Sequence, residues 1–400
     1  MFSGTFLSDL FPISALLISI LSLGNGYNFS CVIEPSDPQD ANSTQRNIYP
    51  GNLWPNGVVT YRLHDSIREN CDHDIEKAYL AMQEISSKTC IKFKAWEAGD
   101  KNFVDLMVDH KECGLAHVCM IGGRQWVKFG GKCRTLETMV HELMHTLCFR
   151  HEHWRPDRNK YLNFMGCHQE PEILEENKKY PLGIYDYGSQ VHYKCIPCHG
   201  GSPTMPGVTK CGSQVTSGLS IIDADKINAL YNCQGCNRHR WRLIKHPNED
   251  VPNMYSFGHK NNVGYISPCR ALINGEISVG FYYSTNKTCS FSFGDAAVYE
   301  FTHNFEVLTF PGGISQPGAT YKWVDREEVE SAKIIKAALP AGREGEIGNS
   351  QTMYIAYVSV DKYQSIGKVA VRNGELQKAV FVFEREVYHA PTRYYVLTCE

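Results

Sequence analysis

The chain has 400 residues, of which 42% are hydrophobic and 21% are charged, a composition typical of a globular protein with two or three domains. The formal net charge at pH 7 is -3, and Lys and Arg do not gather in a stripe, so the sequence argues against nucleic-acid binding. Sixteen cysteines are too many for a reducing cytosol and indicate disulfides formed in an oxidising compartment.

The N-terminus carries an apolar run, residues 11–23, that is too short to span a bilayer and is followed by Gly24 and Gly26. This pattern predicts a signal peptide over residues 1–26, with a membrane anchor as the alternative because no Lys or Arg precedes the run. Residues 27–46 are polar and are interpreted as a short prosegment. Sequons for N-glycosylation begin at Asn28, Asn42 and Asn286. We therefore expect a secreted, extracellular protein with no membrane span once the signal is removed.

A helix and two strands are predicted in the next part of the chain. In residues 74–88 apolar side chains recur every three or four positions, which predicts a helix with one face toward the core. These side chains are Ile75, Ala78, Tyr79, Met82 and Ile85. Residues 89–96 and 104–108 have the apolar patterns of strands. Another apolar segment, residues 125–129, has a pair of glycines on either side.

The most informative stretch is HELMHTLCFRHEHWRPDR, residues 141–158. His141 and His145 are one helical turn apart, so both rings leave the same face of a helix and can hold two positions of a Zn²⁺ ion. His151 supplies a third ligand, which leaves the fourth position for water. Glu142 can reach that water as a general base. The stretch predicts a hydrolase with one catalytic zinc; a histidine-rich helix exposed to solvent is the alternative.

The predicted helix begins near Thr135 and ends around Leu147. Its apolar stripe consists of Leu136, Val140, Leu143, Met144 and Leu147, and it is separate from the face that carries the ligands. A last helix is predicted after Ser220, which is a credible N-cap with Asp223 three residues further on.

The stretch also resembles the signature HExxHxxGFxHExxRxDR of the astacin family of metzincin zinc endopeptidases, except that Cys148 replaces a glycine. RNIYPGNLWPNGVVTYRL, residues 46–63, resembles the start of the family's mature domain. YDYGSQVHY, residues 185–193, resembles its Met-turn, with Val191 in place of the Met. The resemblance implies an α+β fold for residues 47–236. A twisted sheet and the HExxH helix form one lobe of a cleft, and the turn and last helix form the other.

The resemblance further assigns roles to single residues. It implies that Tyr193 stabilises the oxyanion, and that Glu152 contacts the new N-terminus produced by cleavage near Arg46. It implies an edge strand that binds the substrate backbone, for which residues 125–129 are our candidate. It also implies the disulfides Cys90–Cys233 and Cys113–Cys133. The Phe-x-Gly-Asp stretch of astacin prosegments is absent, so the sequence does not explain how latency is kept.

Cys148 stands where the resemblance places a glycine, at a turn that suits a left-handed backbone conformation. A residue with a Cβ pays roughly 1 kcal/mol there. A disulfide could offset this strain, and Cys119 is the preferred partner because the family places its segment near the cleft. A rival interpretation makes Cys148 a zinc ligand.

Residues 237–400 have a different sequence pattern, in which strand-like runs are separated by Gly, Asn and Pro turns. An internal repeat is visible, because FEVLT at 305–309 matches YYVLT at 394–398, and residues 270–275 resemble residues 336–342. These pieces resemble DM9 repeats, of which some bind glycans, so the domain is predicted to be β-rich with two DM9-like repeats.

Two functions follow from these observations. The first is a secreted zinc endopeptidase that acts on protein or peptide substrates. The second is a secreted glycan-binding protein whose protease domain is relaxed or weakly active, for which the changes at Cys148 and Val191 are the argument.

Overall fold

In the computed structural model, the described residues are 52–400 except for short gaps at 71, 112, 168–172, 174–182, 216, 257–263, 295–296, 318, 332, 346–349 and 361–362. The predicted signal peptide, the prosegment and the cleavage position near Arg46 lie outside the described residues. Among the described residues, no helix is long and apolar enough to cross a membrane.

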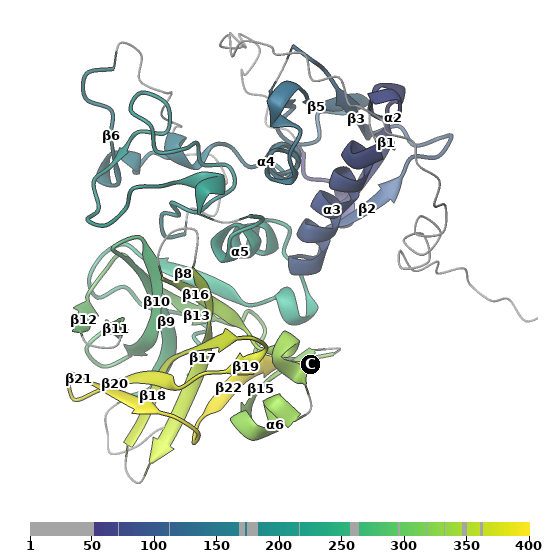
Figure 1. Cartoon of the computed structure of the whole chain (residues 1–400). Helices are drawn as coiled ribbons and strands as arrows, with labels where there is room; N and C mark the ends of the chain where they lie inside the picture. The colour runs from purple at the N-terminus through teal and green to yellow at the C-terminus, as the bar shows by residue number, and fades with distance from the viewer. Residues whose placement is uncertain are drawn as a thin grey trace, which may run out of the picture. The chain divides into compact units, whose positions relative to one another are not determined.

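A five-stranded sheet with helices packed against it forms the first part of the described chain (Figure 1). Its strands are β1 (Val58–Leu63), β2 (Lys92–Ala95), β3 (Phe103–Val108), β4 (Gly114–Ala116) and β5 (Arg124–Phe129). The order across the sheet is β2-β1-β3-β5-β4, with every pair parallel except β5 and β4, which run antiparallel. The prediction of residues 125–129 as the edge strand is therefore wrong: β5 is paired on both sides and β4 is the edge.

The helices of this part are α2 (Asp65–Asn70), α3 (Asp72–Lys88), α4 (Leu136–Thr146) and α5 (Ile221–Leu230). Helix α3 buries Ala78, Ala81, Met82 and Ile85, whereas Tyr79, predicted to be buried, is 38% exposed. Ala81 takes part in the buried face because the 78, 81, 82, 85 spacing follows one stripe of the helix more closely. Helix α4 buries Val140, Leu143 and Met144 in the same core cluster, and its C-cap residue Leu147 is buried there too, whereas Leu136 of the predicted stripe is partly buried.

Helices α4 and α5 begin at residues whose side chains cap them. Thr135 caps α4 by accepting the N–H of Thr138. Ser220 and Asp223 form the predicted capping box of α5, in which each side chain accepts a backbone N–H of the other residue. These caps fix where the two helices start, and both helices carry residues of the site described below.

The segment between α4 and α5 is mostly irregular and contains only two short strands, β6 (Leu162–Asn163) and β7 (Ser202–Pro203), among its described residues. Two disulfides hold it, Cys167–Cys198 and Cys195–Cys211, so Cys195 and Cys198 do not pair with each other. This agrees with their interpretation as cysteines that hold loops together.

The rest of the chain is a large, mostly antiparallel sheet system with one short helix, α6 (Arg326–Ser331) (Figure 1). Its strands are β8 (Arg240–Ile244), β9 (Ile266–Ile273), β10 (Glu276–Tyr283), β11 (Thr288–Phe293), β12 (Ala297–Phe301), β13 (Phe305–Thr309), β14 (Ser315–Gln316), β15 (Ala319–Asp325), β16 (Pro340–Glu344), β17 (Gln351–Val360), β18 (Tyr363–Arg372), β19 (Glu375–Leu376), β20 (Ala379–Phe383), β21 (Glu386–Ala390) and β22 (Tyr395–Cys399).

Two sets of six strands in this sheet share one pairing order. The first set runs β8-β13-β9-β10-β11-β12 and the second runs β15-β22-β17-β18-β20-β21. Strands β13 and β22, which carry FEVLT and YVLT, occupy equivalent places. Residues 270–275 belong to β9 and the turn after it. The counterpart of β9 in the second set is β17, whereas residues 336–342 come before β17 and end in β16. The proposed equivalence of residues 270–275 with residues 336–342 is therefore wrong.

A pair of glycines supports this correspondence. A Cβ on Gly280 would lie 2.0 Å from the carbonyl oxygen of Ser290, and a Cβ on Gly367 would lie 2.0 Å from that of Val380. Both glycines lie in the fourth strand of their set and let the fifth strand approach closely. Gly367 begins a Gly-Lys-Val run, residues 367–369, and its counterpart in the first set is Gly280.

Candidate functional site

Three imidazole rings converge at the end of α4. The Nε2 atom of His141 lies 3.1 Å from Nε2 of His145 and 3.2 Å from Nε2 of His151. His145 and His151 are buried and His141 is partly exposed. His141 and His145 share a helix face, and His151 comes from the chain that folds back after Cys148.

The hydrogen bonds of the rings test whether this cluster suits a metal. Nδ1 of His141 donates to the carbonyl of Gln190 and Nδ1 of His145 donates to the carbonyl of Phe149, both at 2.6 Å. With the proton held at Nδ1, each neutral ring directs the Nε2 lone pair into the cluster. Lone pairs this close repel one another unless a cation lies among them. Zn–N bonds of about 2.1 Å in a tetrahedral site separate the nitrogens by about 3.4 Å, so the cluster fits zinc.

Glu142 lies against strand β4. A Cβ built on Gly114 would be 2.3 Å from the Oε1 atom of Glu142, so only glycine leaves room for this carboxylate. Gly114, Leu115 and Ala116 line one small cavity together with Glu142 and the three histidines. The edge strand and the predicted general base therefore face the same space.

Replacing Gly114 by alanine should displace the Glu142 carboxylate while leaving the three histidines in place. We expect kcat for a peptide substrate to fall by about a hundredfold, the cost of misplacing a reacting group by about 1 Å. Zinc content measured by atomic absorption and the circular dichroism spectrum should match those of the wild type. Full turnover by the zinc-loaded variant would show that the close approach does not position Glu142.

Tyr193 lies beside the histidines, with its ring centroid 4.4 Å from that of His151 and 6.1 Å from that of His141. His153 fixes the backbone of Tyr193, because its Nδ1 atom accepts the N–H of Tyr193 at 3.3 Å. The two rings also pack at 4.5 Å. His153 is fully buried, and burial lowers its pKa well below the usual value, so the ring is neutral.

The turn beneath the histidines carries Val191, which is 2% exposed and packs in the same core cluster as Met144 and Leu147. The carbonyl of Val191 accepts the N–H of Glu152 at 3.0 Å, and the preceding carbonyl, that of Gln190, holds His141. The turn thus supplies an apolar floor and two backbone acceptors.

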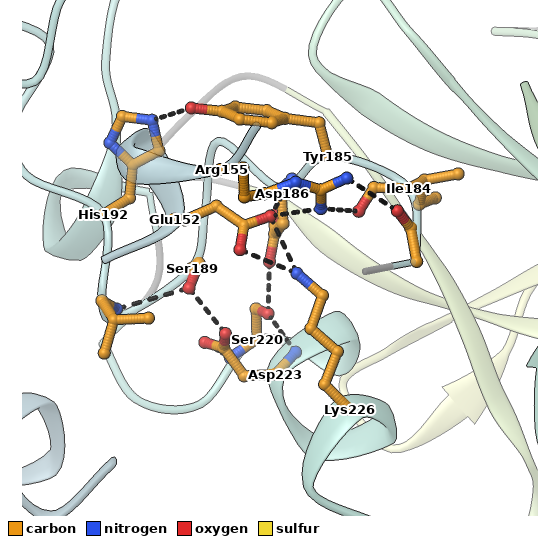
Figure 2. A network of polar contacts seen from close by, with 12 residues as sticks. Glu152, Arg155, Ile184, Tyr185, Asp186, Ser189, His192, Ser220, Asp223 and Lys226 are labelled. Atoms are coloured by element: carbon orange, nitrogen blue, oxygen red, sulfur yellow. Dashed lines mark hydrogen bonds and ion pairs between the residues drawn. The ribbon is translucent and has the colours of Figure 1, made fainter. Parts of the chain in front are cut away.

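Glu152 is the centre of a buried network of charged groups (Figure 2). Both carboxylate oxygens lie 2.8 Å from Nζ of Lys226, and Oε1 also accepts from Nη1 of Arg155 at 2.8 Å. The backbone N–H of Asp186 donates to the same oxygen at 3.1 Å. Burial alone would raise the pKa of Glu152, but Lys226 and Arg155 outweigh it and lower that pKa. Contact of Glu152 with a new N-terminus stays a prediction, because residues 1–51 lie outside the described chain.

Two buried carboxylates lie next to this network. Asp223 accepts from the Ser189 hydroxyl at 2.6 Å and from the N–H of Gln190 at 2.8 Å, and Asp186 accepts from the Ser220 hydroxyl at 2.5 Å (Figure 2). Burial, together with the neighbouring charge of Asp186, raises the pKa of Asp223 to about 7. Asp223 therefore both caps helix α5 and accepts hydrogen bonds from the turn that carries Val191.

The raised pKa of Asp223 determines whether its contribution to stability rises or falls with pH. An unfolded Asp has a pKa of about 3.9, so between about pH 4 and 7 the unfolded chain loses this proton while the folded chain keeps it. The contribution of Asp223 to the free energy of unfolding is full below about pH 4 and declines as the pH rises to about 7. Asparagine imitates the protonated form, so the variant Asp223→Asn should lose this part of the slope in urea unfolding curves measured across the same range. An unchanged slope would contradict the assignment.

Cys148 has a φ of +80°, the left-handed conformation predicted from the replaced glycine, and Cys119 has a φ of +68°. The two residues are joined by a disulfide, so Cys148 is not available as a zinc ligand. The side chain of Gln125, which is fully buried, donates to the carbonyl of Cys119 at 2.8 Å and fixes the same loop. The structure also pairs Cys90 with Cys233 and Cys113 with Cys133.

Sequence reasoning missed Gly114, His153 and Lys226. The pattern His-Glu-His at residues 151–153 was a signal for His153, whose ring stacks on that of the ligand His151 with the centroids 5.1 Å apart. Lys226 gave no local signal, since its partner Glu152 is 74 positions away in the sequence.

Comparison with known proteins agrees with the geometry. Residues 46–232 match the model of the astacin peptidase family, and residues 261–386 match that of the DM9 repeat. Astacin-like metalloprotease toxin 2 of Loxosceles intermedia is 32% identical over 195 residues, which cover 46% of this chain and 74% of the toxin. Zinc metalloproteinase nas-13 of Caenorhabditis elegans is 35% identical over 191 residues, 45% of this chain and 41% of that protein.

Among solved structures, high choriolytic enzyme 1 of Oryzias latipes, a hatching enzyme zinc-protease, is 25% identical and covers 46% of this chain and 94% of its own. Its TM-score is 0.38, so the classification rests on the sequence comparisons. The chain spans less than half of the length of nas-13 and of similar nematode relatives such as nas-14, of which it covers 38%.

Proposed function

Because the chain belongs to the astacin family of zinc metalloendopeptidases, we propose that it is a secreted endopeptidase that cleaves extracellular proteins with Glu142 as the general base. The observation that carries the proposal is the convergence of three imidazole Nε2 atoms beside a carboxylate that faces an edge strand. His141, His145 and His151 would hold one Zn²⁺ ion. Zinc bound there supplies a Lewis acid that polarises a peptide carbonyl and acidifies water.

The residues of the chain would divide the remaining work. Strand β4 has a free edge among the described strands, on which an extended peptide can add as a further strand, so that its backbone lies across the cavity. Glu142 takes a proton from the attacking water and passes it to the leaving amine. Tyr193, held by His153, provides a hydroxyl for the oxyanion that develops on the carbonyl oxygen.

Secretion is supported by the chemistry of the described residues. Seven disulfides join all the described cysteines, which suits an oxidising compartment. The sequon at Asn286 lies in the exposed turn between β10 and β11, where the Thr288 hydroxyl donates to the Asn286 side chain at 2.9 Å. The carboxamide is thus open to glycosylation.

The proposal is tested with the form that starts near Asn47. This protein should cleave casein or gelatin, lose the activity when a chelator removes the metal, and regain it when zinc is returned. The absence of cleavage by the zinc-loaded protein would contradict the proposal.

The DM9 match favours a second candidate function for the C-terminal part, the binding of glycans. The full-length Glu142→Gln variant, which cannot cleave glycoproteins, should then bind specific glycans on an array. Binding without any proteolysis by the wild type would make the glycan-binding protein the better description.

A further inference from the structure

A buried ion pair in the large C-terminal sheet, β8 to β22, bonds two segments of the peptidase part. Glu306 of β13 and Arg270 of β9 lie directly opposite each other, with Oε2 of Glu306 2.7 Å from Nε of Arg270. Both side chains are fully buried. Nη1 of Arg270 also donates to Asp225 of α5 at 2.7 Å, and Oε1 of Glu306 accepts the N–H of Ile184 at 3.1 Å. The pair is therefore bonded to α5 and to the start of the segment that contains the turn beneath the histidines.

The second set of strands shows that this strand arrangement forms without such a pair. FEVLT of residues 305–309 matches YYVLT of residues 394–398, so Glu306 corresponds to Tyr395. In the first set Glu306 lies opposite Arg270, and in the second set Tyr395 lies opposite Tyr357. Apolar side chains of similar volume often stabilise a fold as well as a buried ion pair does, so the stability of the sheet does not explain the pair. Its bonds to the peptidase part indicate that it holds those segments in place.

The backbone of Ile184 is held from two directions. Its N–H bonds Glu306, and its carbonyl accepts from Nη1 of Arg155 at 3.1 Å (Figure 2). The preceding residue, Gly183, has a φ of +46°, and a Cβ there would lie 2.8 Å from Oε1 of Glu306. Glycine thus lets the carboxylate approach the backbone. Because Ile184 is buried, its N–H would lose its only described acceptor if Glu306 were removed.

Tyr185, the next residue, connects this peptide group to the proposed oxyanion donor. The side chain of Tyr185 is fully buried, and its hydroxyl lies 2.7 Å from Nε2 of His192 (Figure 2). Nδ1 of His192 donates to the carbonyl of Tyr193 at 2.6 Å, so Nε2 of the neutral ring accepts from Tyr185. A continuous series of contacts therefore runs from Glu306 to the backbone of Tyr193.

We propose that Glu306 is a positioning residue of the peptidase, which fixes the Ile184 peptide group and, through it, the hydroxyl of Tyr193. The inference rests on the proposed endopeptidase function. Glu306 does not line the cavity that contains Glu142, so it acts through its neighbours. A hydroxyl that bonds the oxyanion stabilises the transition state and not the bound substrate. Misplacing it should therefore lower kcat and leave KM nearly unchanged.

Glu306→Met and Glu306→Gln separate the hydrogen bond from the charge. Both changes remove the negative charge beside Arg270, but only glutamine keeps an oxygen that can accept the N–H of Ile184. In the zinc-loaded form that starts near Asn47, Glu306→Met should lower kcat for a quenched peptide about tenfold, less than the cost of a full 1 Å misplacement. Glu306→Gln should stay close to the wild-type kcat. Gly183→Ala, whose Cβ would displace the same carboxylate, should lower kcat as well and replaces Glu306→Met if that variant does not fold.

A double-variant cycle with Tyr193→Phe tests whether the effect passes through Tyr193. Tyr193→Phe alone should lower kcat about a hundredfold, the loss expected for one oxyanion donor. Adding Glu306→Met to Tyr193→Phe should then cause little further loss, because coupled sites are not additive. Losses that multiply, or a wild-type kcat for zinc-loaded Glu306→Met, would overturn the inference. Failure of the parent protein to cleave any peptide would instead contradict the endopeptidase function itself.

Glu330→Met is the matched control. Glu330 of α6 accepts the N–H of Leu376 and pairs with Arg326, both at 3.1 Å, so it makes the same kinds of bond as Glu306 within the C-terminal part. Its replacement should leave kcat unchanged. Amide hydrogen exchange adds a measurement that needs no turnover: residues 184–193 should exchange faster in Glu306→Met than in the wild type or in Glu330→Met. Equal exchange in the three proteins would contradict the proposed link.

Discussion

The Glu142→Gln variant is expected to bind one zinc ion and to lose peptide hydrolysis by about a thousandfold in kcat. Glutamine keeps the shape of the side chain against Gly114 but cannot accept the proton, and general base catalysis contributes about 10²–10⁴-fold. The three histidines, and the carbonyl groups that accept from His141 and His145, are untouched by the change. Atomic absorption measures whether the variant retains zinc. Initial rates on a quenched peptide measure the loss of hydrolysis.

Glu137→Gln is the matched control, because Glu137 lies in the first turn of the same helix, outside the cavity. It should retain zinc and turnover. If the zinc-loaded Glu142→Gln variant cleaves the peptide at a rate near that of the wild type, Glu142 is not the base.

Lys226→Met should destabilise the protein by about 3–5 kcal/mol, the range observed when one partner of a buried ion pair is removed. Glu152 and Lys226 are 6% and 7% exposed, and Lys226 bonds both carboxylate oxygens. Without the ammonium, Arg155 alone opposes the burial of the charge, so the pKa of Glu152 should rise. Urea unfolding at neutral pH measures the loss of stability.

Lys88→Met provides the comparison, since Lys88 pairs with Glu84 at the surface and such pairs contribute at most about 1 kcal/mol. The double variant Glu152→Gln/Lys226→Met removes the lone buried charge and should recover part of the lost stability. A Lys226→Met protein as stable as the Lys88→Met protein would contradict the role assigned to the network.

The pH dependence of this pair has a definite sign. The folded pKa of Glu152 is lowered, so its stabilisation is present above the unfolded value of about 4.3 and is lost as the pH falls through the folded value. Asp223 acts in the opposite direction, because its pKa is raised. Glu152 therefore stabilises the folded state above about pH 4.3, and Asp223 stabilises it most below about pH 4.

The sequence was sufficient to predict features that depend on short spacings. The i, i+4 spacing of His141 and His145 sets their shared face wherever the helix forms, and Thr135 and Ser220 cap helices through bonds to residues three positions away. The replacement of a glycine by Cys148 indicated a left-handed backbone, because that conformation is a local requirement of the turn.

Features that depend on distant partners were not predictable in the same way. Strand β4 has only three residues, and the stronger apolar pattern of β5 drew the prediction of an edge strand to the wrong segment. Whether a strand is paired on one or both sides depends on the whole sheet. The repeat alignment failed at residues 336–342 for a related reason: a similar run of letters lies in strands with different neighbours.

A zinc titration of the chelator-treated protein tests the central claim most directly. The form that starts near Asn47, freed of metal by dialysis, is mixed with increasing amounts of zinc up to a clear molar excess, and the rate on a quenched peptide is measured at each step. Turnover should be absent without zinc, rise in proportion to added zinc and level off at one equivalent per chain. Peptide cleavage that is the same with and without zinc would contradict the account.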